Sequence, residues 1–184
     1  MREKIGTIKG ERAAYDFYAT NPHDVKQIIE LLDYPKNFKI LEPCAGNGHI
    51  SETLKNLGYK NVFTNDIVER DLQLDSVKDF LKEDLPVKCF DLVVLNPPFK
   101  HAKEFIEKSL QYANDVLVIA RLDLLETKAR KDLNNKHLSC VFVHSKRARF
   151  AKNGDEERFK DSTSMSSAWF LYKKLKEETK LIVI

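Results

Sequence analysis

The 184-residue sequence has no apolar run that approaches the ~20 residues of a membrane-spanning helix. Its first residues also lack the apolar core of a signal peptide. We therefore expect a cytoplasmic protein without a membrane partner. Hydrophobic residues make up 42% of the chain, which is sufficient for a globular core, and the length suits a single domain.

Cysteine is also scarce. The three cysteines, Cys44, Cys89 and Cys140, are odd in number and widely spaced, so they do not form a disulfide framework. Each lies in or beside an apolar run, which predicts buried free thiols. Cysteine and histidine do not cluster with the spacing of a zinc site, so we expect no metal.

The net charge of +3 is small, but basic residues are unevenly distributed along the chain. Residues 121–160 contain 11 Lys or Arg against 6 Asp or Glu, an excess of 5 positive charges. A basic face of this kind suits a polyanionic partner, although a solvated charged surface gives the same pattern. Residues 151–165 are polar, with several serines, and are expected to form a mobile loop.

Apolar segments with strand and helix periodicity alternate through most of the chain. Strands are expected at 38–41, 61–66, 75–79, 89–95, 115–120, 138–144 and 167–172, and helices at 22–32, 48–57, 102–110 and 122–134. The alternation predicts a Rossmann-like, doubly wound, mostly parallel α/β sheet of seven strands. The last two strands lack a clear helix between them, which predicts an antiparallel strand at one edge. Residues 1–14 are a flexible lead-in to one domain, 15–184.

Ligands of such a sheet bind beyond the carboxyl ends of its strands. One loop there runs from Glu42 to Gly48, and its two glycines, Gly46 and Gly48, allow a sharp turn close to a ligand. Ser51 stands where a dinucleotide-binding motif requires a third glycine, which disfavours a nicotinamide-dependent oxidoreductase. The acid at Glu42 suits a ligand with a positive amino group. A plain tight turn would have the same composition.

Two further acids follow predicted strands. Asp66 ends the second strand, where a carboxylate accepts hydrogen bonds from ribose hydroxyls. Asp79 and Phe80 could contact an adenine. The acid would accept a hydrogen bond from the adenine amino group, and the phenylalanine ring would pack on the base. A surface acid beside a core phenylalanine is the alternative for this pair.

Asn96-Pro97-Pro98-Phe99 is the most specific feature of the sequence. Two prolines directly after a buried strand remove two backbone donors and stiffen its exit. An asparagine and an aromatic ring on this frame have fixed positions at the ligand-binding edge. We interpret the segment as a site for transfer to a planar, conjugated amine.

On these motifs the chain resembles class I S-adenosylmethionine-dependent methyltransferases, and most closely the small adenine-specific DNA methyltransferases of phages and related mobile elements. The Asn-Pro-Pro-Phe motif and the loop 42–48 carry the resemblance, which extends over residues 15–172. Segment 15–22 resembles the part that closes over the methionine end of the cofactor. The resemblance implies catalytic residues Asn96, Pro97, Pro98 and Phe99; cofactor-binding residues Phe17, Tyr18, Thr20, Glu42, Ala45, Gly46, Gly48, Asp66, Ile67, Asp79 and Phe80; and nucleic-acid-binding residues Lys146, Arg147 and Arg149.

The expected reaction is methylation of the exocyclic amino group of adenine in DNA. Phe99 replaces the tyrosine commoner in DNA enzymes, and phenylalanine at this position also occurs in enzymes that methylate adenine in RNA. Adenine in RNA and a protein glutamine therefore stay open as substrates, and a non-catalytic cofactor-binding module is a further alternative. The chain is too short for a separate target-recognition domain, so region 121–160 is the expected source of any sequence specificity.

Overall fold

The computed structural model describes residues 18–85, 89–152, 154–160, 166–176 and 178–184. The predicted lead-in, residues 1–14, and the predicted cofactor contact Phe17 lie outside this part of the chain. The described elements, in chain order, are β1 (Tyr18–Thr20), α1 (Pro22–Leu32), β2 (Lys39–Glu42), α2 (His49–Asn56), β3 (Asn61–Asp66), β4 (Ser76–Val77), β5 (Phe90–Leu95), η1 (Phe99–His101), α3 (Ala102–Tyr112), β6 (Ala113–Arg121), η2 (Leu122–Leu125), α4 (Lys128–His137), β7 (Leu138–Val143), β8 (Phe150–Lys152), η3 (Glu156–Lys160), β9 (Ser167–Lys173) and β10 (Lys180–Val183).

The described strands form one large sheet of eight strands in the order β10-β7-β9-β6-β5-β2-β3-β4. The predicted doubly wound, mostly parallel sheet is confirmed, but two details of the prediction are wrong. The antiparallel strand β9 is not at an edge, because it pairs with β6 on one side and with β7 on the other. The sheet has eight strands rather than seven because residues 180–183 add β10 parallel to β7.

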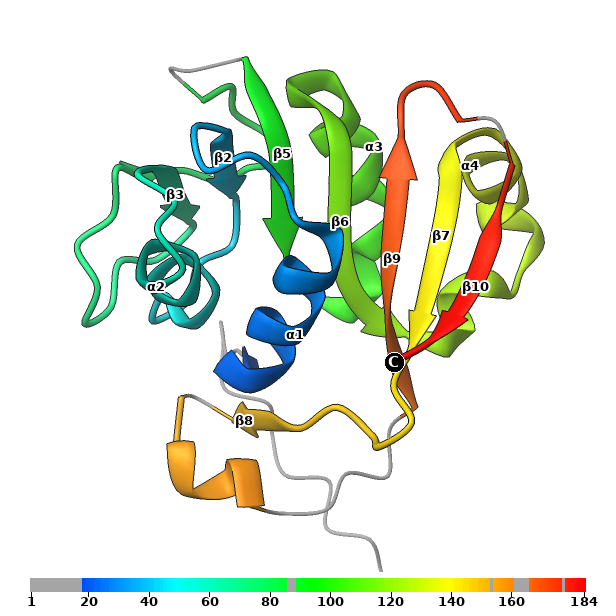
Figure 1. The fold of residues 1–184 in the computed structure, drawn as a ribbon. Coiled ribbons are helices and arrows are strands. Elements are labelled where there is room, and N and C mark those ends of the chain that lie inside the picture. The colour runs from blue at the N-terminus through cyan, green and yellow to red at the C-terminus, as the bar shows by residue number, and fades with distance from the viewer. Residues whose placement is uncertain (1–17, 86–88, 153, 161–165, 177) are drawn as a thin grey trace, which may run out of the picture.

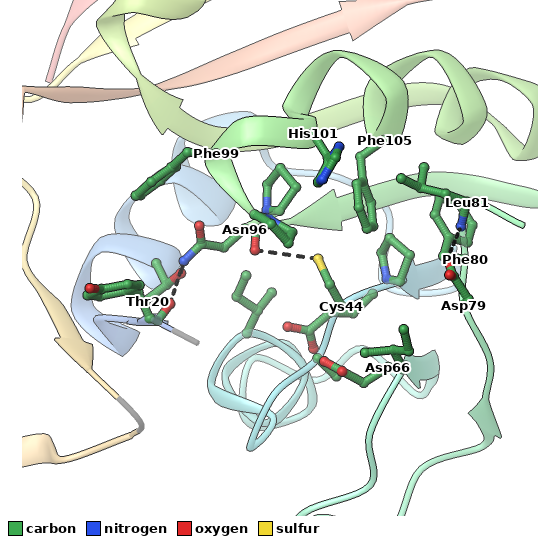
Figure 2. Close-up of a pocket in the computed structure, with 18 of the residues that line it drawn as sticks. Thr20, Cys44, Asp66, Asp79, Phe80, Leu81, Asn96, Phe99, His101 and Phe105 are labelled. Atoms are coloured by element: carbon green, nitrogen blue, oxygen red, sulfur yellow. Dashed lines mark hydrogen bonds between the residues drawn. The ribbon is translucent and has the colours of Figure 1, made fainter. Parts of the chain in front are cut away.

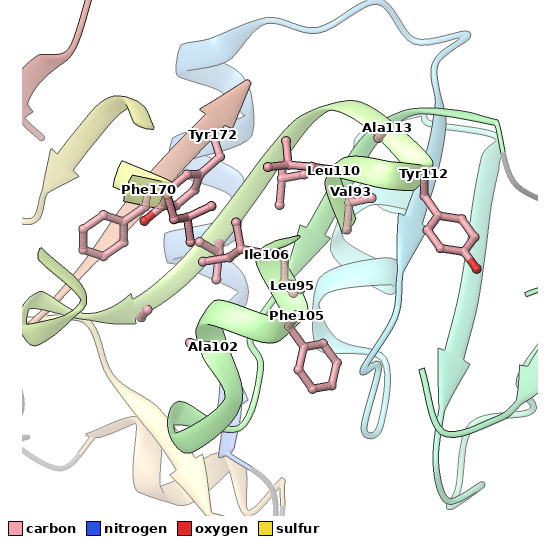
Figure 3. Packing of buried hydrophobic residues seen from close by; sticks show 14 of the residues in the cluster. Val93, Leu95, Ala102, Phe105, Ile106, Leu110, Tyr112, Ala113, Phe170 and Tyr172 are labelled. Carbon is pink, nitrogen blue, oxygen red and sulfur yellow. The ribbon is translucent and has the colours of Figure 1, made fainter. Parts of the chain in front are cut away.

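Helices cover both faces of the sheet, with α1 and α2 on one face and α3 and α4 on the other (Figure 1). A hydrophobic cluster lies on each face of the sheet, and β5 contributes to both. Val93 and Leu95 belong to the cluster under α3, whereas Leu92 and Val94 belong to the cluster under α1 and α2. Figure 3 shows the first of these clusters. All four side chains are fully buried. An unbroken apolar strand is what burial on both faces requires.

The helices largely follow their sequence signals. Asn21 caps α1, because its side-chain Oδ1 accepts a hydrogen bond from the His23 N–H at 2.9 Å. The helix predicted at 122–134 is instead divided into η2 and α4. Thr127 lies between them with a φ of 83°, a left-handed conformation that an α-helix does not contain. None of the helices in the described ranges is long and apolar enough to cross a membrane.

A second, two-stranded sheet joins β1 to β8 in antiparallel pairing, with Thr20 opposite Phe150 and Tyr18 opposite Lys152. Neither strand was predicted. The loop expected from residue 151 onward begins instead with this strand, and Ala151 is fully buried. The pairing fixes β1 beside β8, which lies below the large sheet, near the carboxyl ends of its parallel strands (Figure 1).

The thiols correct another expectation. Cys140 is buried as predicted, whereas Cys44 is half-buried and Cys89 is exposed. Cys89 immediately precedes β5 and lies outside the apolar core that the strand enters. Cys44 faces a cavity at the opposite edge of the sheet, which contains most of the predicted site.

Candidate functional site

A cavity of about 650 Å³ opens at the carboxyl ends of β2, β3 and β5. This is the edge at which open α/β sheets bind their ligands. Its walls come from β1 and from the loops that follow the three parallel strands (Figure 2). Twelve of the predicted site residues line it: Tyr18, Thr20, Glu42, Ala45, Asp66, Ile67, Asp79, Phe80, Asn96, Pro97, Pro98 and Phe99. The cavity is large enough for a small-molecule ligand.

Glu42, at the end of β2, contributes a buried acid to the cavity wall. Its side chain is 1% exposed and accepts a hydrogen bond from the Ser51 N–H at 2.9 Å. Burial penalises the charged form and raises the pKa of Glu42 from 4.5 to about 8, although the bonds from Ser51 act in the opposite direction. A buried acid in this environment suits a cationic group of a ligand, because the positive charge would compensate the negative charge of the ionised carboxylate.

Asp66, at the end of β3, organises the glycine loop. One carboxylate oxygen accepts from the Gly46 N–H at 2.8 Å, and the other accepts from the Val68 N–H at 3.2 Å. Arg70 contacts the second oxygen at 3.4 Å. Gly46 and Gly48 themselves are not part of the cavity wall. Their left-handed backbone, with φ of 57° and 81°, instead allows the turn that brings Ala45 and the start of α2 to the cavity wall.

Asp79 and Phe80 lie on the same side of the cavity, after β4. The Asp79 carboxylate pairs with Lys82 at 2.9 Å and accepts from the Leu81 N–H at 3.1 Å. The hydrogen bond from Lys82 is the main reason that the pKa of Asp79 is lowered. Phe80 is 2% exposed and its ring lies on that of Phe105 at 5.6 Å. Phe80 thus belongs to the core and also lines the cavity.

Asn96, directly after β5, is held by β1. Its amide Nδ2 donates to the Tyr18 carbonyl at 2.6 Å and to Thr20 Oγ1 at 3.1 Å. Figure 2 shows the amide nitrogen turned toward Thr20 and the oxygen turned away from it. The Asn96 backbone carbonyl accepts from the Cys44 thiol at 3.4 Å, which ties the exit of β5 to the loop after β2. Burial is the main reason that the pKa of this thiol is raised.

Phe99 follows the two prolines and begins the short helix η1. Its ring is half-buried and stacks near the Tyr18 ring, with centroids 6.3 Å apart and planes at 26°. Pro98 keeps an extended ψ of 122°, and its carbonyl accepts from the His101 N–H at 2.8 Å, so the motif is fixed at both ends. Two exposed cationic or titratable side chains, Lys100 and His101, complete this rim of the cavity.

Lys146, Arg147 and Arg149 lie outside the cavity wall, on the exposed segment between β7 and β8. Arg149 donates to the Phe159 carbonyl at 3.1 Å. Further residues of the wall are not predicted from the sequence: Ala19, Pro43, Cys44, His49, Ile50, Arg70, Lys78, Leu81, Lys82, Lys100, His101 and Phe105. Most of these neighbour predicted positions, so scanning two residues beyond each strand-end motif would have found them.

No protein-family model matches the chain. Over 102 residues it is 33% identical to the type II methyltransferases M.HincII and M.HindII of Haemophilus influenzae. The aligned part makes up 51% of this chain but only 20% of M.HincII and 19% of M.HindII. The chain thus spans about a fifth of the length of the curated relatives that it matches.

Solved methyltransferases share the fold. The type I restriction-modification methyltransferase subunit of Streptococcus thermophilus superposes with a TM-score of 0.67 at 16% identity, over 91% of this chain and 47% of that one. A dimethyladenosine transferase of Plasmodium falciparum gives 0.57 at 16% identity, over 85% and 63%. The resemblance to methyltransferases predicted from the sequence is therefore confirmed, in fold over most of the chain and in sequence over half of it.

Proposed function

We propose that the chain is an S-adenosylmethionine-dependent methyltransferase that methylates the exocyclic amino group of adenine in DNA. The observation that carries the proposal is the orientation of Asn96. Both hydrogens of its amide are used by β1, so the oxygen is the part presented beside Phe99. An acceptor and an aromatic face at one strand exit are what a planar amine requires.

The cavity fits the cofactor. Glu42 is a buried acid that suits the amino group of the methionine part. A carboxylate has about four lone-pair sites, and Gly46, Val68 and Arg70 donate to Asp66, so Asp66 can still accept from one ribose hydroxyl. Asp79 and Phe80 would hold the adenine end, and Thr20, Ala45 and Ile67 would line the path of the cofactor. When bound, the cofactor supplies an activated methyl group on a sulfonium centre.

The residues of the chain contribute mainly positioning and electrostatics. The Asn96 side-chain oxygen and the Pro97 carbonyl accept the two hydrogens of the target amine, which draws its lone pair out of conjugation and aims it at the methyl group. Phe99 stacks on the ring that carries the amine. No strong base is needed, because the proton can leave after transfer. Donors and acceptors fixed before the reaction are the usual source of such catalysis.

DNA is the favoured polymer for two reasons. The sequence relatives are type II methyltransferases, and the Streptococcus thermophilus subunit comes from a restriction-modification system, a kind of system that acts on DNA. The exposed Lys146, Arg147 and Arg149 also suit a phosphate backbone better than a protein substrate. A buried adenine must leave its stack to enter a cavity of this depth.

The substrate is tested by incubating the protein with labelled S-adenosylmethionine and, separately, duplex DNA, single-stranded DNA, RNA or a protein extract. We expect label in DNA, and an Asn96→Ala variant that binds the cofactor but does not transfer. Label in RNA alone, or in protein alone, would move the proposal to that substrate class. Cofactor binding by calorimetry without label in any arm would favour a non-catalytic module.

A further inference from the structure

We propose that Tyr18 forms the second face of an aromatic clamp, so that the target base lies between the Tyr18 and Phe99 rings. This inference rests on the proposed function and specifies how the substrate is bound. The resemblance assigned Tyr18 to the cofactor, whereas the structure brings its ring to the substrate side, against the Phe99 ring. The clamp favours a nucleobase over the small amide of a glutamine side chain.

The Tyr18 and Phe99 rings are close to parallel but are not in full face-to-face contact. An aromatic pair in full face-to-face contact would have its ring centres about 3.5–4.0 Å apart, the optimal separation of carbon atoms. The observed centroid distance is 6.3 Å, with the planes inclined by only 26°. A flat base between two rings needs about 7 Å, twice one contact distance. Aromatic pairs in direct contact have centroids about 4.5–7 Å apart, so one of the two half-buried rings must change rotamer and turn aside before a base can lie between them.

The catalytic amide lies beside this pair of rings. Asn96 Nδ2 donates to the Tyr18 carbonyl at 2.6 Å, so one residue provides both a ring for stacking and an anchor for the acceptor. Phe99 is three residues beyond Asn96 on the proline-stiffened exit of β5. A base held between the rings would thus have an edge within reach of the Asn96 side chain.

The second strand, β8, supports the position of Tyr18. Tyr18 pairs with Lys152 and Thr20 pairs with Phe150, so the clamp residue belongs to a hydrogen-bonded ribbon rather than to a lone terminal segment. Ala19, between them, is 4% exposed and packs inward. Tyr18 and Thr20 consequently share the opposite face of this three-residue strand, and on that face Thr20 Oγ1 accepts from Asn96 at 3.1 Å.

The test compares Tyr18→Leu with the conservative Tyr18→Phe, which keeps the ring and removes only the hydroxyl. Steady-state methylation of a single-stranded oligonucleotide with one adenine in a thymine tract avoids the energy of unpairing a duplex. Cofactor affinity is measured in parallel by calorimetry. Fluorescence of 2-aminopurine, placed at the adenine position, reports stacking of the base without requiring chemistry.

We expect Tyr18→Leu to raise KM for the oligonucleotide by about 5- to 150-fold, the range that loss of one stacking contact gives. Cofactor affinity should change by less than twofold, quenching of 2-aminopurine should be lost, and Tyr18→Phe should restore most of both. If the leucine variant instead weakens cofactor binding and leaves KM unchanged, or changes neither, the clamp is wrong while the proposed function stands. If the wild type does not quench the probe and also transfers no label to duplex or single-stranded DNA in the substrate assay, the proposed function fails and the clamp fails with it.

Discussion

Replacement of Glu42 by glutamine should change how the stability of the cofactor-free protein depends on pH. Burial raises the pKa of Glu42 from 4.5 to about 8 in the fold, while the unfolded chain keeps the ordinary value. A carboxyl with a raised folded pKa favours folding most at low pH. That contribution is fully present below pH 4.5, is lost as the pH rises toward 8, and is constant above this window.

The size of the effect follows from about 1.4 kcal/mol for each pKa unit. Relative to Glu42→Gln, the wild type should lose on the order of 3–5 kcal/mol of unfolding free energy between pH 4.5 and 8.5. Urea denaturation of both proteins at steps of half a pH unit measures the difference. The glutamine variant has its own cost, since Ser51 N–H must find the amide oxygen, but that cost does not depend on pH. Parallel stability curves for the two proteins would refute the reasoning.

Three further predictions concern the site and its frame. Phe99→Ala should weaken binding of a single-stranded oligonucleotide by about 5- to 150-fold, while cofactor binding measured by calorimetry stays unchanged. If the variant binds the oligonucleotide as well as the wild type does, Phe99 does not stack on the base. Gly48→Ala should lower the thermal midpoint by about 2–8 °C, because a side chain at φ +81° costs roughly 1–2 kcal/mol and its Cβ would lie 2.6 Å from the Leu72 side chain. Gly58→Ala, at φ +92° with open space around it, is the matched control and should lose less. Triple alanine replacement of Lys146, Arg147 and Arg149 should flatten the salt dependence of DNA binding by about 0.9 in log–log slope per lost phosphate contact, and an unchanged slope would remove these residues from the interface.

The parallel part of the fold and its ligand edge could be predicted because each strand is a local apolar run that ends in a distinctive loop. Asn96 directly follows such a strand and Glu42 ends one, and both line the cavity. Strand order is a different matter, since it depends on pairing between distant segments. Nothing in residues 167–173 indicates that β9 inserts between β6 and β7 rather than adding at an edge.

The small ribbon of β1 and β8 was missed for the same physical reason. Each strand has three residues, too few for a periodic pattern, and their partners are separated by about 130 positions in the sequence. Consequently the sequence does not predict that Tyr18 and Thr20 anchor Asn96, although its motifs indicate all three as site residues. Motifs identify which residues carry the chemistry, whereas long-range pairing determines which of them meet.

The measurement that tests the central claim most directly is the chemical identity of the methylated product. DNA lacking adenine methylation is incubated with the protein and S-adenosylmethionine, digested to nucleosides and analysed by mass spectrometry beside the Asn96→Ala variant. Our account predicts N6-methyladenine with the wild type and at least 10²-fold less with the variant, the scale of losing one preorganised polar contact. Methylation at a ring nitrogen or on cytosine, or undiminished product from Asn96→Ala, would contradict it.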